Sequence, residues 1–128
     1  MKKLTLFSFA LLTLGTIQPQ IVHAGDEAEV EHYESKEFAD EKSALVGLVS
    51  TSTEMAAIAA QAELDATSIE KIHQISYTTE NAIAILGTNE KLAAALEEVH
   101  LASEEHDVAD LKNKFIAYQA ELNSYLAQ

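Results

Sequence analysis

Between Ser35 and Gln128 the chain contains no proline and only two glycines, Gly47 and Gly87. This stretch is rich in alanine, leucine, glutamate and lysine, and its apolar residues recur at spacings of three and four. Residues of high helix propensity, placed with the period of an amphipathic helix and without strand-like alternation, predict an all-α domain. Since the sequence has no cysteine, disulfides and thiolate metal sites are excluded.

Cap residues divide this stretch into four helical segments. The first is expected over residues 35–63, with a cap at Ser35. The second follows a cap at Asp65 or Thr67 and ends at Gly87. The third begins at Thr88, and the fourth begins after a cap at Asp107. Because short connections make neighbouring helices antiparallel, we predict an up-down-up-down antiparallel four-helix bundle over residues 35–128. A three-helix arrangement is the alternative, because the hydroxyl side chains of residues 51–53 weaken the first segment.

The apolar stripes of the four segments predict the core. They comprise Phe38, Leu45, Leu48, Met55, Ala59 and Ala62; Ile69, Ile72, Ile75, Thr79, Ile83 and Leu86; Leu92, Ala95, Leu96, Val99 and Ala102; and Val108, Leu111, Phe115, Tyr118, Leu122 and Tyr125. Tyr77, Tyr118 and Tyr125 are expected as core residues whose hydroxyls reach water.

Residues 1–24 have the pattern of a secretory signal peptide. Two lysines precede an apolar run over residues 4–14, and small residues place the cleavage site after Ala24. The run is too short for a transmembrane span, so we expect a soluble periplasmic or secreted protein with no membrane span after signal removal. Residues 25–34 are acidic, with little apolar material, and are expected to form a flexible arm before the bundle.

The chain is strongly acidic, with a formal net charge of −13. Removal of residues 1–24 leaves six lysines, no arginine and 21 acidic residues, a net charge of −15. We expect no nucleic-acid partner, because phosphates repel such a surface and arginine, the usual phosphate-binding side chain, is absent. A solvated, self-repelling surface is the main interpretation, and a cationic partner is the alternative.

Two histidines are predicted to meet in the bundle. If the chain reverses at Leu86–Gly87, His73 and His100 lie at the same height on adjoining helices and at similar offsets from their apolar stripes. Both imidazoles then point into the shared groove, or both point away from it. If the first segment folds back onto the second, Met55 comes within about one turn of His73.

This layer predicts a candidate cofactor site. Its proposed metal ligands are His73, His100, Met55, Glu80, Glu97 and Glu104. Imidazole and thioether ligands suit copper or zinc, or the axial positions of a b-type haem. The main interpretation is a pair of structural histidines that donate to glutamates or cap a polar gap in the core, and the metal or haem site is the alternative. A di-metal carboxylate site is not expected, because Glu70 of the Glu-x-x-His spacing at 70–73 falls on the outer helix face.

Two strings in the sequence resemble a known family. They are IHQISYTTENA over residues 72–82 and LEEVHLASE over residues 96–104. The family consists of small exported proteins of Gram-negative bacteria, mainly gammaproteobacteria, without an assigned activity. The matching positions are His32, Tyr33, His73, Tyr77, Thr78, Glu80, Asn81, Glu97, Glu98, His100, Ser103 and Glu104. The resemblance covers most of the chain after residue 24 and implies a fold and a compartment, but no activity.

More loosely, the chain is similar to periplasmic four-helix bundles of the cytochrome b562 type. That type holds haem between a Met early in the first helix and a His late in the fourth. Here Met55 lies late in its segment, and no His follows His106. The ligand positions of that type therefore do not match.

Together these features predict a non-enzymatic, acidic bundle with a binding or structural role. The first alternative is a copper-, zinc- or haem-binding module using Met55, His73 and His100. The second is an envelope interaction or chaperone-like protein that offers an apolar groove to an unknown partner chain. Enzymatic activity is not expected, because no Ser/His/Asp order stands out and a packed helical core leaves little room for a cleft.

Overall fold

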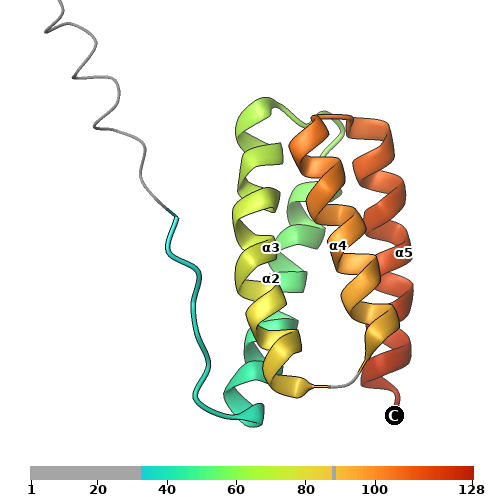
Figure 1. Cartoon of the computed structure of the whole chain (residues 1–128). Coiled ribbons are helices and arrows are strands. Elements are labelled where there is room, and N and C mark those ends of the chain that lie inside the picture. Colours follow the sequence, from blue (N-terminus) through green and yellow to red (C-terminus); the bar gives the residue numbers. More distant parts are fainter. Residues whose placement is uncertain (1–32, 88) are drawn as a thin grey trace, which may run out of the picture. The chain divides into compact units, whose positions relative to one another are not determined.

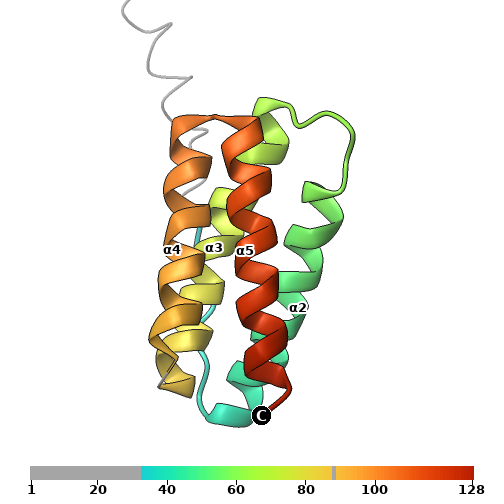
Figure 2. The ribbon, with the colours of Figure 1, turned by 90° about the vertical axis from the view of Figure 1, so that its right-hand side faces the viewer.

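The structure, a computed structural model, describes residues 33–87 and 89–128. The predicted signal peptide and most of the predicted arm lie outside the described residues. The described chain forms four helices: α2 (Glu41–Ala59), α3 (Ala66–Leu86), α4 (Glu90–Glu105) and α5 (Val108–Leu126). Consecutive helices run antiparallel (Figures 1 and 2), which confirms the predicted all-α four-helix bundle.

Side-chain caps begin all four helices. Asp40, Asp65, Asn89 and Asp107 each accept a hydrogen bond from the backbone N–H three residues later, at 2.7–3.0 Å. Helix α3 ends at Gly87, whose φ of 82° is the left-handed conformation that glycine adopts without a steric penalty. The predicted caps at Asp65 and Asp107 and the predicted stop at Gly87 are confirmed.

The predicted start of the first helix at Ser35 is wrong. Residues 33–39, which we call the strap, are non-helical, and α2 begins only at Glu41. The reason is a capping box at Asp40 and Ser43, in which each side chain bonds the other residue's backbone N–H. The Ser35 hydroxyl instead accepts a hydrogen bond from Asn81 of α3. Helix α2 also ends at Ala59, before the predicted residue 63.

The core follows the predicted stripes closely in α3, α4 and α5 and less closely in α2. In α2 the buried side chains are Ala44, Leu48, Ser52 and Met55. Leu45, predicted to be buried, is 41% exposed, because the register set by the Asp40 cap turns Ala44 inward. The third helix starts at Glu90 after its Asn89 cap, two residues later than predicted.

The bundle closes through three extensive helix contacts and one smaller contact. Helix α2 packs on α3, α3 on α4 and α4 on α5, while α2 and α5 meet over a smaller area. The two hydroxyls of Ser52 and Tyr118 join α2 to α5 through a buried hydrogen bond of 2.6 Å. None of the helices in the described residues is long and apolar enough to cross a membrane.

Candidate metal centre

His73 of α3 and His100 of α4 form the centre of the candidate site. Their ring centroids lie 4.8 Å apart with an interplanar angle of 78°, an edge-to-face contact. The reversal at Gly87 therefore brings the two imidazoles together in the groove between α3 and α4, as the counting from Leu86–Gly87 predicts. His73 is half-buried and His100 is buried.

Tyr77 completes a three-ring cluster with the histidines. Its ring meets His73 at 5.1 Å and His100 at 4.7 Å, both edge to face. Because His73 and Tyr77 are four residues apart on α3, they share one helix face. Tyr77 is 38% exposed, so its prediction as a core residue is wrong. The spacing of four residues between His73 and Tyr77 is the feature of the sequence from which the place of Tyr77 at the site could have been inferred.

Hydrogen bonds around His73 define its tautomer. The Ser103 hydroxyl donates its single proton to the His100 carbonyl at 2.5 Å, so it accepts from His73 Nδ1 at 3.3 Å. His73 therefore carries its proton on Nδ1 and exposes a lone pair on Nε2. The Tyr77 hydroxyl donates to that lone pair at 3.3 Å. This long hydrogen bond leaves Nε2 as the ring nitrogen available to a metal ion.

His100 lies between two carboxylates. Its Nδ1 is 2.6 Å from Oε1 of Glu80, and its Nε2 is 3.4 Å from Oε1 of Glu104, one turn further along α4. When His100 is neutral and donates its Nδ1 proton to Glu80, its Nε2 lone pair faces the Glu104 carboxylate; when the ring is protonated, both nitrogens donate to the carboxylates. Two electron-pair donors at this distance attract each other only when a proton or a metal ion lies between them.

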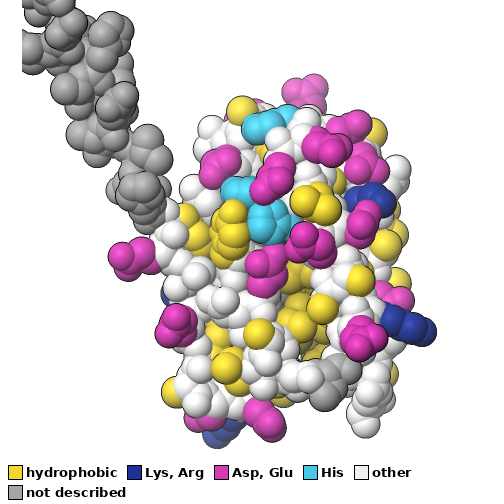
Figure 3. All heavy atoms as spheres, viewed as in Figure 1, with side chains coloured by type: hydrophobic (Ala, Val, Ile, Leu, Met, Phe, Trp, Pro, Cys, Tyr) yellow, Lys and Arg dark blue, Asp and Glu magenta, His cyan; other side chains and the backbone are white. Residues whose placement is uncertain are grey.

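The potential ligand atoms form two groups that share His100. One nitrogen or oxygen atom from each of His73, His100 and Glu104 lies within 4.8 Å of the others, and the same holds for Glu80, Glu97 and His100. Five of the six predicted ligands are therefore gathered in one groove. In Figure 3 two adjacent histidines lie in the middle of this face with acidic side chains around them, while the lysines drawn lie toward its edges.

Met55, the sixth predicted ligand, lies in the hydrophobic core. Its side chain is fully buried on α2. The four ring nitrogens of the histidine pair are directed at Ser103, Tyr77, Glu80 and Glu104 instead. The groove therefore presents nitrogen and oxygen ligands without the thioether.

The histidine pair does not fit a b-type haem. Two axial imidazoles bind iron from opposite faces of a porphyrin, so the macrocycle has to pass between them. The rings of His73 and His100 touch edge to face and are joined further by Tyr77. That packing leaves no space for a porphyrin, whereas a single metal ion at the open side of the rings needs none.

Ser103 is a functional candidate that the sequence indicated only through the family resemblance. Its hydroxyl links the two helices by joining the His100 carbonyl to His73 Nδ1. Ser103 follows His100 by three residues, so it lies one turn along the same face of α4. That spacing is the signal from which its role could have been inferred.

Comparison with known proteins gives one family match. A family model described as "Family of unknown function (DUF6746)" matches residues 1–127. No curated protein and no solved structure matches the chain.

Proposed function

The chain belongs to the family of unknown function DUF6746, and we propose from the geometry of the groove that it binds a divalent transition-metal ion, zinc or copper(II). The ligands are His73, His100 and Glu104. Imidazole and carboxylate groups suit zinc and copper(II), whereas copper(I) prefers sulfur. One observation carries the proposal: His100 Nε2 and Glu104 Oε1 lie 3.4 Å apart, with a ring nitrogen of His73 within 4.8 Å of this group.

The ligand atoms need only a small contraction to surround the ion. With metal–ligand bonds of roughly 2.0–2.1 Å, tetrahedral ligand atoms lie about 3.3 Å from one another. One ring nitrogen of each histidine and one carboxylate oxygen of Glu104 already lie within 4.8 Å of one another. Glu104 is exposed and His73 half-buried, so both side chains have room to move toward the ion. Water fills the fourth position.

Both histidines are held in the orientation that metal binding requires. Metal-ligating histidines usually donate their second ring N–H to a carboxylate or another acceptor, which fixes the tautomer. His100 has Glu80 as that acceptor at 2.6 Å, and His73 has the Ser103 hydroxyl at 3.3 Å. Glu80 is therefore assigned a positioning role. Glu97, close to Glu80 and His100, adds negative charge that favours a cation.

We propose that this binding takes place after export and without catalysis. The secretory pattern of residues 1–24 supports a periplasmic or secreted location. The sequence has no cysteine and no evident Ser/His/Asp order, which supports a role in binding rather than in turnover. The candidate groove is also at the surface, where an ion reaches it directly.

Calorimetric titration of the metal-free protein with zinc tests the proposal. We expect one zinc ion per chain in the wild type. His73→Ala, His100→Gln and Glu104→Gln should weaken binding by more than tenfold, and Glu80→Gln by about 10- to 100-fold through loss of orientation.

His106→Ala is the matched control, since His106 lies in the connection between α4 and α5. It should leave zinc affinity unchanged. Thermal unfolding of each metal-free variant checks that the bundle remains folded. Wild-type zinc affinity in folded His73→Ala and His100→Gln variants would refute the proposal.

A further inference from the structure

A cavity of about 470 Å³ lies between the strap and the first half of α2, away from the histidine groove. Apolar atoms of Phe38 and Val46 line it together with the backbone at Gly47, and lysines stand at both ends. A cavity of this size holds a small organic ligand. It is lined by none of the residues assigned to the metal centre.

The strap is fixed in place by side chains of α3. The Tyr33 hydroxyl lies 2.7 Å from Thr78 Oγ1, which also accepts from the backbone N–H of Lys36 at 3.1 Å. Asn81 donates to the Ser35 hydroxyl at 3.1 Å and to the Lys36 carbonyl at 3.0 Å. Four hydrogen bonds thus hold a non-helical segment against the bundle, and this segment forms one wall of the cavity.

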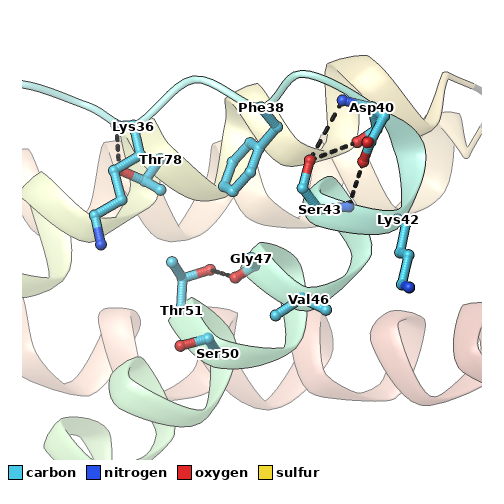
Figure 4. A pocket seen from close by; sticks show the side chains of 10 residues that line it. All are labelled: Lys36, Phe38, Asp40, Lys42, Ser43, Val46, Gly47, Ser50, Thr51 and Thr78. Carbon is cyan, nitrogen blue, oxygen red and sulfur yellow. Dashed lines mark hydrogen bonds between the residues drawn. The ribbon is translucent and has the colours of Figure 1, made fainter.

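Phe38 and Gly47 shape the floor of the cavity. In Figure 4 the Phe38 ring extends from the strap toward Gly47 of α2, and Lys36 and Lys42 lie on either side of it. A Cβ at position 47 would overlap the Phe38 ring, so glycine is required for this close approach. Val46, next to it, is 65% exposed toward the opening. The result is an apolar surface that is open to solvent.

The charge of the cavity differs from that of the rest of the molecule. Lys36 and Lys42 are two of the six lysines that follow residue 24. Neither forms an ion pair within residues 33–87 and 89–128, whereas Lys71 and Lys114 both do. The one carboxylate in the lining, Asp40, accepts the backbone N–H of Ser43 as the cap of α2. Two ammonium groups are therefore available here to an anion.

We propose that this cavity binds a small amphipathic carboxylate, with its apolar chain against Phe38 and Val46 and its carboxylate at Lys36. Lys36 is favoured over Lys42 because it lies on the strap two residues from Phe38, whereas the Lys42 side chain extends away from Phe38 (Figure 4). The Thr51 hydroxyl, whose proton is donated to the Gly47 carbonyl at 2.9 Å, borders the chain region. This site is independent of the proposed metal centre.

Titration of the ¹⁵N-labelled protein with octanoate, followed by amide chemical shifts, tests the proposal. The shifts should saturate and map to residues 36–51 and Thr78. Lys36→Gln should weaken binding about fivefold, as expected for loss of one well-placed ion pair near a surface. Val46→Glu should weaken it about tenfold or more, because it replaces an apolar contact with a like charge.

Three controls make the result decisive. Lys91→Gln, an exposed lysine of α4, should leave the affinity unchanged. Octan-1-ol, which has the same chain without the charge, should bind at least about fivefold more weakly. Equal affinity for the alcohol, wild-type affinity in folded Lys36→Gln, or shifts centred outside residues 36–51 would each overturn the proposal. Because Lys36, Lys91 and Val46 are exposed, their substitution should leave the bundle folded.

Discussion

Alkaline unfolding offers a quantitative test of the buried contact between α2 and α5. Tyr118 is fully buried, and its hydroxyl lies 2.6 Å from the Ser52 hydroxyl. Burial raises the pKa of Tyr118 from 10.0 to about 12, because the phenolate loses its hydration in the core; the Ser52 hydrogen bond opposes this only in part. The folded state therefore keeps the phenol proton where the unfolded state loses it.

The sign and size of the effect follow from this difference. Between pH 10 and pH 12 the unfolded chain binds fewer protons at Tyr118 than the folded chain, so the free energy of unfolding falls as pH rises. The contribution is fully present below pH 10. Its loss is about 1.4 kcal/mol at pH 11 and about 2 kcal/mol at pH 12, since one pKa unit corresponds to ~1.4 kcal/mol.

Tyr118→Phe separates this contribution from the other groups that titrate in alkali. At pH 7 the variant should be about 1 kcal/mol less stable, because the buried Ser52 hydroxyl loses its partner. By pH 12 the difference should vanish or reverse. Ser52→Ala retains Tyr118 and should keep the alkaline loss. Urea unfolding monitored by circular dichroism from pH 7 to 12 measures both trends, and an equal alkaline loss in wild type and Tyr118→Phe would refute the reasoning.

Three further predictions concern the caps and the core. The Ser68 N–H hydrogen bond lowers the pKa of Asp65 below 3.8, so its stabilisation is present above that pH and is lost as pH falls through the folded-state pKa; Asp65→Asn should keep the cap but lose this acid dependence in urea titrations at pH 2–5. Gly87→Ala should lower the free energy of unfolding by about 1 kcal/mol, because alanine resists a φ of 82°; an unchanged midpoint in thermal melts would contradict the left-handed cap. Met55→Leu should leave zinc affinity unchanged and cost less than about 1.5 kcal/mol of stability; weaker zinc binding by calorimetry would return Met55 to the ligand set.

The helix ends could be predicted where the signal is local. Asp65, Gly87 and Asp107 act through hydrogen bonds or dihedral angles within a few residues, which the sequence records directly. The start of α2 could not be predicted in this way. Ser35 and Asp40 are both good caps; the capping box with Ser43 favours Asp40, and contacts with Asn81 and Thr78, more than 40 residues from Ser35, hold residues 35 and 36 outside the helix.

In the candidate site too, some features could be predicted from the sequence and others depend on how the helices pack. The pairing of His73 with His100 follows from counting residues on both sides of the turn, because α3 and α4 are regular up to Gly87. Whether the rings face the groove depends on how the helices pack, which the count does not fix. Whether Met55 reaches the histidine layer depends on how α2 is rotated about its axis, which the residue count does not fix. The core position of Met55 was predicted from its apolar stripe and is confirmed, but its separation from the histidine nitrogens became evident only in the structure.

X-ray absorption at the zinc edge of the zinc-loaded protein tests the proposed metal centre most directly. Two imidazole nitrogens and oxygen ligands at roughly 2.0–2.1 Å are expected, with no sulfur at about 2.3 Å. The imidazole signal should fall by half in His73→Ala and stay unchanged in His106→Ala. A sulfur ligand, or a shell of oxygen alone, would contradict a centre built from His73, His100 and Glu104.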